Sequence, residues 1–197
     1  MIEWEPLWLS LRLSLVTTAI LLLIALPLAC WLAYSRMRIK TVVESLVSLP
    51  LVLPPSVLGF YLLLAFSPAN TFGKFLYHYL GLRFVFSFQG LVLASIVYNL
   101  PFMVNPILSG LKSLPPSLKE ASSTLGKSGF TTLAKVILPN IRPSLLTGIV
   151  LSFAHTIGEF GVVLMIGGNI PGQTRVASLA IYDEIQSITM LPPTSMR

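Results

Sequence analysis

The chain has 197 residues, of which 54% are hydrophobic and only 10% are charged, with a mean hydropathy of +0.83 and a formal net charge of +6. Soluble domains carry about 25% charged residues. A chain of this length buries only about 70% of its surface on folding, so a soluble fold would expose large apolar patches. The composition excludes an ordinary soluble domain and predicts an integral membrane protein. The basic residues are scattered between apolar runs, which indicates membrane topology signals rather than a nucleic-acid surface.

The first predicted span covers residues 13–35, which contain no charged residue. A helix needs about 20 apolar residues to cross a bilayer. The apolar run is too long for the core of a cleavable signal peptide, so we expect none. The single cysteine, Cys30, lies in this run and is expected to be a small packed hydrophobe.

The second and third predicted spans cover residues 45–67 and 86–111, and prolines interrupt both. Pro50, Pro54 and Pro55 predict that the second span is kinked or opened, because proline removes a helical hydrogen bond. The third span contains two further prolines and is also expected to be bent.

Residues 112–144 differ in character, because they are basic and contain Ser, Thr and Gly turns, so we expect soluble helices there. The fourth predicted span covers residues 145–166. Turn residues predict a loop at 167–172, and residues 176–188 are expected to form a short amphipathic helix. Residues 1–197 are therefore predicted to be one all-α, polytopic membrane domain with about four spans.

Basic residues predict the orientation of the chain, because cytoplasmic loops carry an excess of Lys and Arg. Eight of them lie in the loop after the first span and in the segment after the third, against four in the other two connections. This bias places residues 112–144 in the cytoplasm and the N-terminus on the periplasmic side.

The cytoplasmic segment contains the most specific motif, with residues 119–139 reading KEASSTLGKSGFTTLAKVILP. It resembles the cytoplasmic signature of ABC importer permeases, which reads Glu-Ala-Ala, three residues, Gly, nine residues, Ile, one residue, Leu-Pro. Ser122 replaces the second Ala and Val136 replaces the Ile. Five positions match at the family's spacing: Glu120, Ala121, Gly126, Leu138 and Pro139.

The same residues predict a helix–turn–helix on physical grounds. Pro115 and Pro116 suit a helix start, and Gly126 ends that helix. A second short helix is expected from about Phe130 to Ile137, ending before Pro139. In the family the corresponding helix–turn–helix docks in a groove on an ATP-hydrolysing subunit, and the resemblance implies the same role here.

Two further stretches narrow the resemblance: residues 49–59, LPLVLPPSVLG, and residues 155–168, HTIGEFGVVLMIGG. Both resemble molybdate permeases, with sulfate and tungstate permeases as relatives. The resemblance covers about residues 8–186. It implies a type I ABC importer permease fold in the bacterial inner membrane. It also implies these partners: two ATP-binding subunits, a periplasmic oxyanion-binding protein and a second permease copy.

We expect no catalytic site, cofactor or metal in the chain. It has no Gly-rich loop followed by Lys-Ser/Thr, so ATP must be hydrolysed by another subunit. The alternative cargoes are sulfate, thiosulfate and tungstate. The alternative of another class is a membrane scaffold that transports nothing.

Polar residues within the spans are candidate pathway or gate residues. A carboxylate inside a membrane costs roughly 3 kcal/mol on insertion scales, so Glu159 is either a gate residue or a packing carboxylate bonded to a hydroxyl or backbone N–H. His155 lies one helical turn earlier and could pair with it. Ser56, Asn99 and Thr156 are candidate pathway donors, or helix–helix hydrogen bonds.

The C-terminal residues depart from the family pattern. Relatives continue beyond residues 181–185 into a final membrane helix, whereas residues 187–197 are short and broken by prolines. We therefore expect the chain to lack that last helix.

Overall fold

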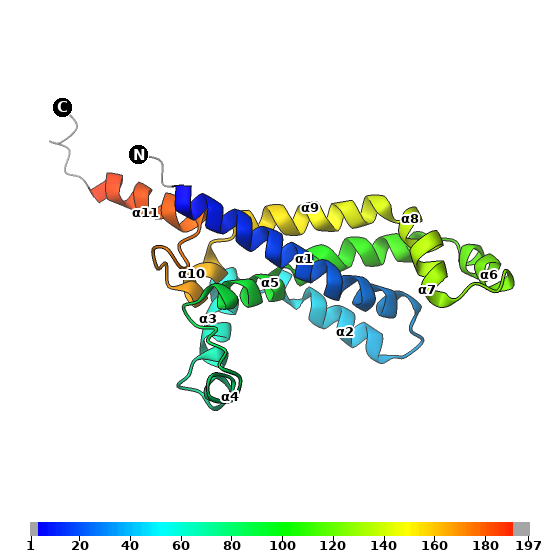
Figure 1. The fold of residues 1–197 in the computed structure, drawn as a ribbon, viewed down its shortest axis with the longest axis horizontal. Coiled ribbons are helices and arrows are strands. Elements are labelled where there is room, and N and C mark those ends of the chain that lie inside the picture. The colour runs from blue at the N-terminus through cyan, green and yellow to red at the C-terminus, as the bar shows by residue number, and fades with distance from the viewer. Residues whose placement is uncertain (1–3, 191–197) are drawn as a thin grey trace.

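The computed structural model describes residues 4–190. Every regular element in that range is a helix, which confirms the all-α fold. The helices form an elongated bundle, with the N-terminus and the last helix at one end and residues 116–132 at the other (Figure 1).

Three helices make up the length of the bundle and pack against one another: α1 (Trp4–Tyr34), α5 (Phe88–Ser113) and α9 (Arg142–Gly158). By length and composition, α1 and α5 could each cross a membrane, and the number of candidate spans reaches four if each of two bent helix pairs is one span. α5 continues through both of its prolines as one helix.

α1 begins at Trp4 rather than at residue 13, so the first helix is longer than the predicted span. Its first turns are held by side-chain contacts. The Arg12 guanidinium lies 4.7 Å from the centre of the Phe88 ring, and Ser10 Oγ accepts a hydrogen bond of 2.8 Å from Ala177 N. These contacts fix the start of α1 on neighbouring helices.

The second predicted span is a bent pair. α2 (Ile39–Ser48) and the 3₁₀ turn η1 (Leu49–Leu51) meet α3 (Pro55–Phe66) at an angle of 109°. The prolines at 54 and 55 lie at the corner, as the expected kink requires. α3 therefore leaves the bundle sideways (Figure 1).

Residues 145–166, the fourth predicted span, are divided between two helices. α9 already begins at Arg142 and ends at Gly158, and α10 (Gly161–Gly167) is a separate short helix. Glu159 has extended backbone angles, φ −65° and ψ 131°, which end α9. α10 then packs against α3 instead of continuing along the bundle.

The remaining helices lie at the two ends. Residues 71–80, expected to belong to a loop, form α4 (Thr71–Leu80), and the expected amphipathic helix is α11 (Ala177–Met190). The segment between α5 and α9 holds four short elements: α6 (Pro116–Thr124), α7 (Gly129–Thr132), the π-helical turn η2 (Leu133–Ile137) and α8 (Leu138–Asn140).

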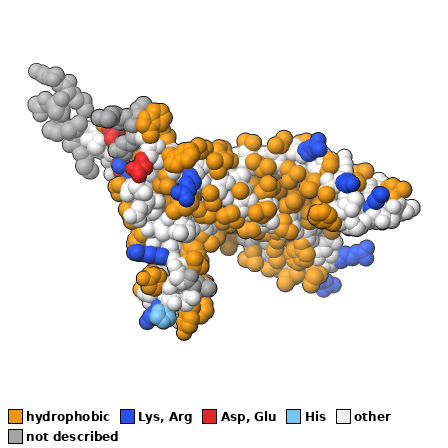
Figure 2. Space-filling model, in the orientation of Figure 1, with side chains coloured by type: hydrophobic (Ala, Val, Ile, Leu, Met, Phe, Trp, Pro, Cys, Tyr) orange, Lys and Arg blue, Asp and Glu red, His pale blue; other side chains and the backbone are white. Residues whose placement is uncertain are grey.

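Buried side chains form two apolar clusters along the bundle. One, which includes Leu21, Met103 and Ile107, lies toward α6, and the other, which includes Leu13, Leu91 and Val162, lies toward α10. Hydrophobic side chains also cover much of the outer flank in the view of Figure 2, where Lys and Arg gather at the ends. An apolar flank with charged ends is the surface that a bilayer requires.

Candidate functional site

Two regions of the structure contain the residues singled out from the sequence. The first is the pair α6 and α7 with the residues that join them, 116–132, named here the coupling hairpin. The second is a cavity where α3, α5, α9 and α10 meet, named here the pathway cavity.

Gly126 makes the turn of the coupling hairpin. Its φ of +68° lies in the left-handed region, where a side chain is strained. Gly126 N donates to Ser123 O and Lys127 N donates to Ser122 O, at 2.9 and 3.1 Å, so the last carbonyls of α6 are satisfied. The expected break at this glycine is therefore a helix C-cap.

Hydroxyl groups join the two helices of the hairpin. Ser122 Oγ and Thr132 Oγ1 lie 2.7 Å apart and are buried. Ser128 caps α7, because its Oγ accepts a hydrogen bond of 3.2 Å from Thr131 N. Ser122 is the position at which the motif departs from the family's second Ala, and its hydroxyl is the group that crosses between the helices.

The second motif half lies in a widened helical turn rather than in the short helix expected to end before Pro139. Leu138 N donates to Leu133 O across the π turn η2. Proline lacks the N–H that would continue the α-helical ladder, and π turns of this kind absorb such a mismatch. The chain then continues through α8 and bends into α9 by 76° at Ile141.

The tip of the hairpin exposes two large apolar side chains. Phe130 is 80% exposed and Leu125 is 73% exposed. Glu120 and Ala121 lie on α6 and are also exposed. The hairpin is tied to the end of α1 by Lys119, whose Nζ lies 4.3 Å from the centre of the Tyr34 ring.

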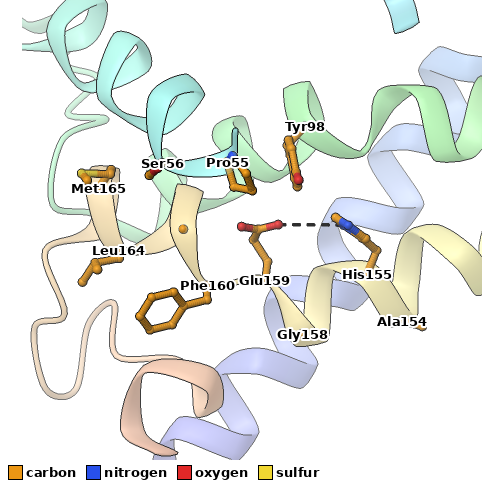
Figure 3. A pocket seen from close by; sticks show the side chains of 11 residues that line it. Pro55, Ser56, Tyr98, Ala154, His155, Gly158, Glu159, Phe160, Leu164 and Met165 are labelled. Atoms are coloured by element: carbon orange, nitrogen blue, oxygen red, sulfur yellow. Dashed lines mark ion pairs between the residues drawn. The ribbon is translucent and has the colours of Figure 1, made fainter. Parts of the chain in front are cut away.

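The pathway cavity has a volume of about 660 Å³. Pro55 and Ser56 line it from the start of α3, and Tyr98 lines it from α5 (Figure 3). His155 and Glu159 contribute the opposite wall from the end of α9. Because the four helices meet at the break between α9 and α10, the cavity lies where the backbone leaves the regular bundle.

Glu159 is buried, with only 5% of its surface exposed. Oε1 accepts a hydrogen bond of 3.1 Å from Val162 N in the first turn of α10. Oε2 lies 3.9 Å from His155 Nδ1. Ser178 Oγ on α11 donates to the Glu159 backbone carbonyl at 2.5 Å. The carboxylate thus matches the packing role, with a backbone N–H as its partner.

Asn99 orients the imidazole of His155. Asn99 Nδ2 donates to Ser95 O at 2.8 Å, which leaves Asn99 Oδ1 to face His155 Nδ1 at 2.9 Å. An amide oxygen can only accept, so Nδ1 carries the hydrogen. The Phe102 ring stacks on the imidazole with centroids 4.2 Å apart. His155 is therefore held by α5 on two sides.

Three of the five candidate pathway residues, Ser56, His155 and Glu159, line the cavity. Asn99 does not line the cavity itself, but it is hydrogen-bonded to His155, which does. Thr156 is buried and donates to Ser152 O at 2.7 Å, so its hydroxyl is used within α9.

Two aromatic residues of the site were missed in the sequence. Tyr98 lines the cavity, and its ring centroid lies 5.1 Å from that of His155; Phe102 stacks on the same imidazole. Tyr98 and Phe102 are four residues apart on α5 and flank Asn99, and this spacing on one helical face was the available signal.

Glycines allow α10 to approach α3. A Cβ at Gly161 would lie 2.9 Å from Pro55 Cβ, and one at Gly59 would lie 2.8 Å from Met165 Cβ. A Cβ at Gly158, by contrast, would meet nothing within 4 Å, so this glycine is not needed for close packing.

Comparison with known proteins assigns the chain to a family. Residues 25–195 match the family described as "Binding-protein-dependent transport system inner membrane component". The chain belongs to this family, and it is a multi-pass membrane protein.

The chain is also similar to individual permeases within this family. The chain is 45% identical over 181 residues to the molybdenum transport system permease protein ModB of Azotobacter vinelandii, covering 91% of this chain and 80% of that protein. It is 36% identical over 191 residues to ModB of Escherichia coli K12, covering 95% and 83%. The sulfate transport system permease protein CysT of Salmonella typhimurium is 35% identical over 147 residues, covering 75% of this chain and 53% of that protein.

A solved structure shares the fold. The crystal structure of an amino acid ABC transporter with histidines matches with a TM-score of 0.58 and 21% sequence identity, covering 94% of this chain and 78% of that chain. At this identity the match supports the arrangement of helices, the type I permease fold, and nothing more specific.

Proposed function

We propose that this chain is the permease subunit of an ABC importer that moves molybdate across the bacterial inner membrane. ATP is hydrolysed by two copies of a separate subunit, and a periplasmic binding protein delivers the oxyanion. A second copy of the chain completes the pathway. The N-terminus lies on the periplasmic side and the coupling hairpin lies in the cytoplasm.

The observation that carries the proposal is the exposed tip of the coupling hairpin. Exposed apolar side chains in a polar setting mark protein contacts, and Leu125 and Phe130 project from a hairpin that internal hydrogen bonds hold in shape. The family signature, with Glu120, Ala121 and Gly126 in its first half, forms that hairpin. A rigid knob with an apolar tip suits a groove on an ATPase subunit.

The cargo is proposed from the relatives, since ModB proteins of two organisms match over more of their own length than the sulfate permease does. The site chemistry agrees with an anion in transit. Glu159 Oε1 accepts a hydrogen bond from Val162 N, and Ser56, Tyr98 and His155 are the other polar groups that line the cavity. The Ser56 and Tyr98 hydroxyls are neutral donors, which can pass an oxyanion without trapping it.

The proposed transport cycle uses the two bends at the ends of α9. α9 connects the coupling hairpin, across the bend at Ile141, to the break at Glu159. Closure of the ATPase subunits would move the hairpin and rock α9, which alternately opens the cavity to each side. The motion involves no covalent chemistry on the anion.

Reconstitution of the complete complex in proteoliposomes tests the proposal. The binding protein loaded with molybdate should stimulate ATP hydrolysis several-fold more than the same protein offered sulfate or thiosulfate. Equal stimulation by sulfate would overturn the assignment of molybdate as the cargo. Failure of the chain to bind an ATPase subunit would overturn the importer assignment and favour a membrane scaffold.

Orientation has its own test. A cysteine introduced at Ser123 of the hairpin, in a Cys30→Ser background, should resist a membrane-impermeant maleimide in intact cells and react in inverted vesicles. Labelling from outside intact cells would contradict the proposed topology and the docking of an ATPase.

A further inference from the structure

α4 has one continuous apolar face that the bundle does not cover. Its apolar residues repeat at the i, i+3, i+4, i+7 spacing of a single helical face, and they are Phe72, Phe75, Leu76 and Tyr79. Phe72 is 55% exposed, Phe75 is 52% exposed and Tyr79 is 74% exposed. An isolated helix of about ten residues is only marginally stable in water. Exposed aromatic side chains along one face of such a helix indicate that the face contacts lipid or protein rather than water.

The opposite face of α4 carries basic and polar side chains together with one exposed aromatic ring, Tyr77. Lys74 and His78 are four residues apart on that face, and both are exposed. Arg83 follows the helix after Gly81, which ends α4 in a left-handed conformation with φ 64°. In Figure 2, basic and histidine side chains lie on the part of the molecule that projects from the bundle. Acidic residues are absent from 68–90, so the segment carries a net positive charge.

The direction of α4 sets it apart from the spanning helices. In Figure 1, α4 is seen nearly end-on, so its axis is perpendicular to the long axis that α1, α5 and α9 follow. It lies near the level at which α5 begins, at the end of the bundle away from the coupling hairpin. If the bundle crosses the membrane along its length, α4 lies parallel to the membrane surface.

The position of α4 is fixed at its start rather than by a packed face. The Asn70 side-chain amide donates to Leu64 O, and the Phe66 ring lies 5.6 Å from the Phe72 ring between centroids. A Cβ at Gly73 would collide with the backbone of Phe66 and Ser67. These contacts anchor α4 to α3 while its apolar face stays open.

We propose that α4 is an interfacial helix that lies in the lipid headgroup layer, on the membrane face opposite the coupling hairpin. The aromatic face enters the acyl boundary, and Lys74, His78 and Arg83 face the anionic headgroups and water. Aromatic residues favour this depth of a bilayer, and a short helix with a basic polar face binds there by burial and by attraction to anionic lipid. The helix thereby fixes the lateral α3 arm, and with it one wall of the pathway cavity, to the membrane surface.

The inference depends on the chain spanning a membrane and does not depend on which anion is carried. Site-directed spin labelling of the full chain in lipid nanodiscs tests it, in a Cys30→Ser background. One nitroxide replaces Phe75 on the apolar face and another replaces Lys74 on the polar face. Leu23 on the exposed flank of α1 and Phe130 at the hairpin tip give matched lipid and water references.

The label at Phe75 should show an oxygen-to-nickel-chelate accessibility ratio several-fold higher than the label at Lys74, and closer to that at Leu23. Equal, water-like ratios at both positions would overturn the proposal. Low accessibility to both reagents at Phe75 would show that protein covers the face, and would overturn it as well.

Lipid composition supplies a second readout, in which the polar face and the headgroups are varied while the label stays at Phe75. In nanodiscs of phosphatidylcholine with phosphatidylglycerol, the label at Phe75 should lie deeper than in phosphatidylcholine alone. The double change Lys74→Gln and Arg83→Gln should remove that difference. A depth that is unaffected by either change would contradict the role of the basic face.

Discussion

The hydroxyl oxygens of Ser122 and Thr132, ten residues apart in the chain, lie 2.7 Å apart and join the two helices of the coupling hairpin. Ser122→Ala should loosen this joint and lower the stability of the hairpin by about 1 kcal/mol, the usual contribution of one hydrogen bond. Faster hydrogen exchange of the α7 amides would report the change. Ser123→Ala is the matched control, because Ser123 is exposed and its hydroxyl bonds within α6. Equal effects of the two changes would count against the joint.

Replacing Gly126 by alanine should be unfavourable because of the backbone conformation at this position, not because of a steric clash. A Cβ at Gly126 meets nothing within 4 Å, yet its φ is +68°, and a side chain in this region costs about 1–2 kcal/mol. Gly126→Ala should reduce ATPase stimulation in the assembled complex. Gly129→Ala is the control, since a Cβ at Gly129 also meets nothing and its φ is not positive. Similar losses at both positions would exclude backbone strain as the cause.

Phe130 should be an anchor for the ATPase subunit. Phe130→Ala removes an exposed ring without leaving a hole in the chain, so the fold should be unchanged. Affinity for the ATPase subunit should fall about tenfold or more, because truncating an interface anchor costs about 1–2 kcal/mol or more. Titration of the subunit onto the permease in nanodiscs measures this. Leu146→Ala, an exposed apolar position on α9, should leave the affinity unchanged, and a loss there equal to that at Phe130 would refute the anchor.

The Glu159 side chain should act as a hydrogen-bond acceptor more than as a charge. Glu159→Gln keeps an oxygen for Val162 N, whereas Glu159→Ala leaves that buried N–H without its acceptor. We expect alanine to destabilise the chain by about 1–3 kcal/mol and glutamine to cost clearly less, as measured by thermal unfolding in detergent. If both variants lose the same stability, the negative charge and not the acceptor is what the site requires.

Gly161 and Gly158 form a matched pair for testing the contact between α3 and α10. Gly161→Ala drives a methyl group to within 2.9 Å of Pro55 and 3.1 Å of Ser56 N, whereas Gly158→Ala enters open space. Overpacking of this kind costs about 1–3 kcal/mol. Thermal unfolding should show a lower midpoint for Gly161→Ala only. An equal decrease in both variants would argue that helix geometry, rather than close packing, limits these positions.

Much of the fold could be predicted because its signals are local. Uncharged runs mark α1 and α5, prolines mark the corner between η1 and α3, and Gly126 marks the hairpin turn. The residues of the signature motif could be singled out for the same reason, since the motif lies within one short segment of chain.

The break at Glu159 could not be predicted from hydropathy, because the residues on both sides of it are apolar. It depends on contacts between distant segments, such as Gly161 against Pro55. The bond between Asn99 and His155 is also long-range, joining residues 56 apart. α4 is different, because the spacing of Phe72, Phe75 and Tyr79 was visible in the sequence, but the segment was interpreted only as a connection.

The uninterrupted length of α9 has a mechanical consequence. Its 17 residues span about 25 Å at 1.5 Å per residue, from the bend beside the coupling hairpin to the wall that holds His155. A rigid helix of this length can act as a lever, so a tilt imposed at the end beside the coupling hairpin would displace the far end in proportion to its length. In the proposed cycle His155 would move with that rod while Asn99 stays on α5, and the 2.9 Å contact between them would lengthen or break.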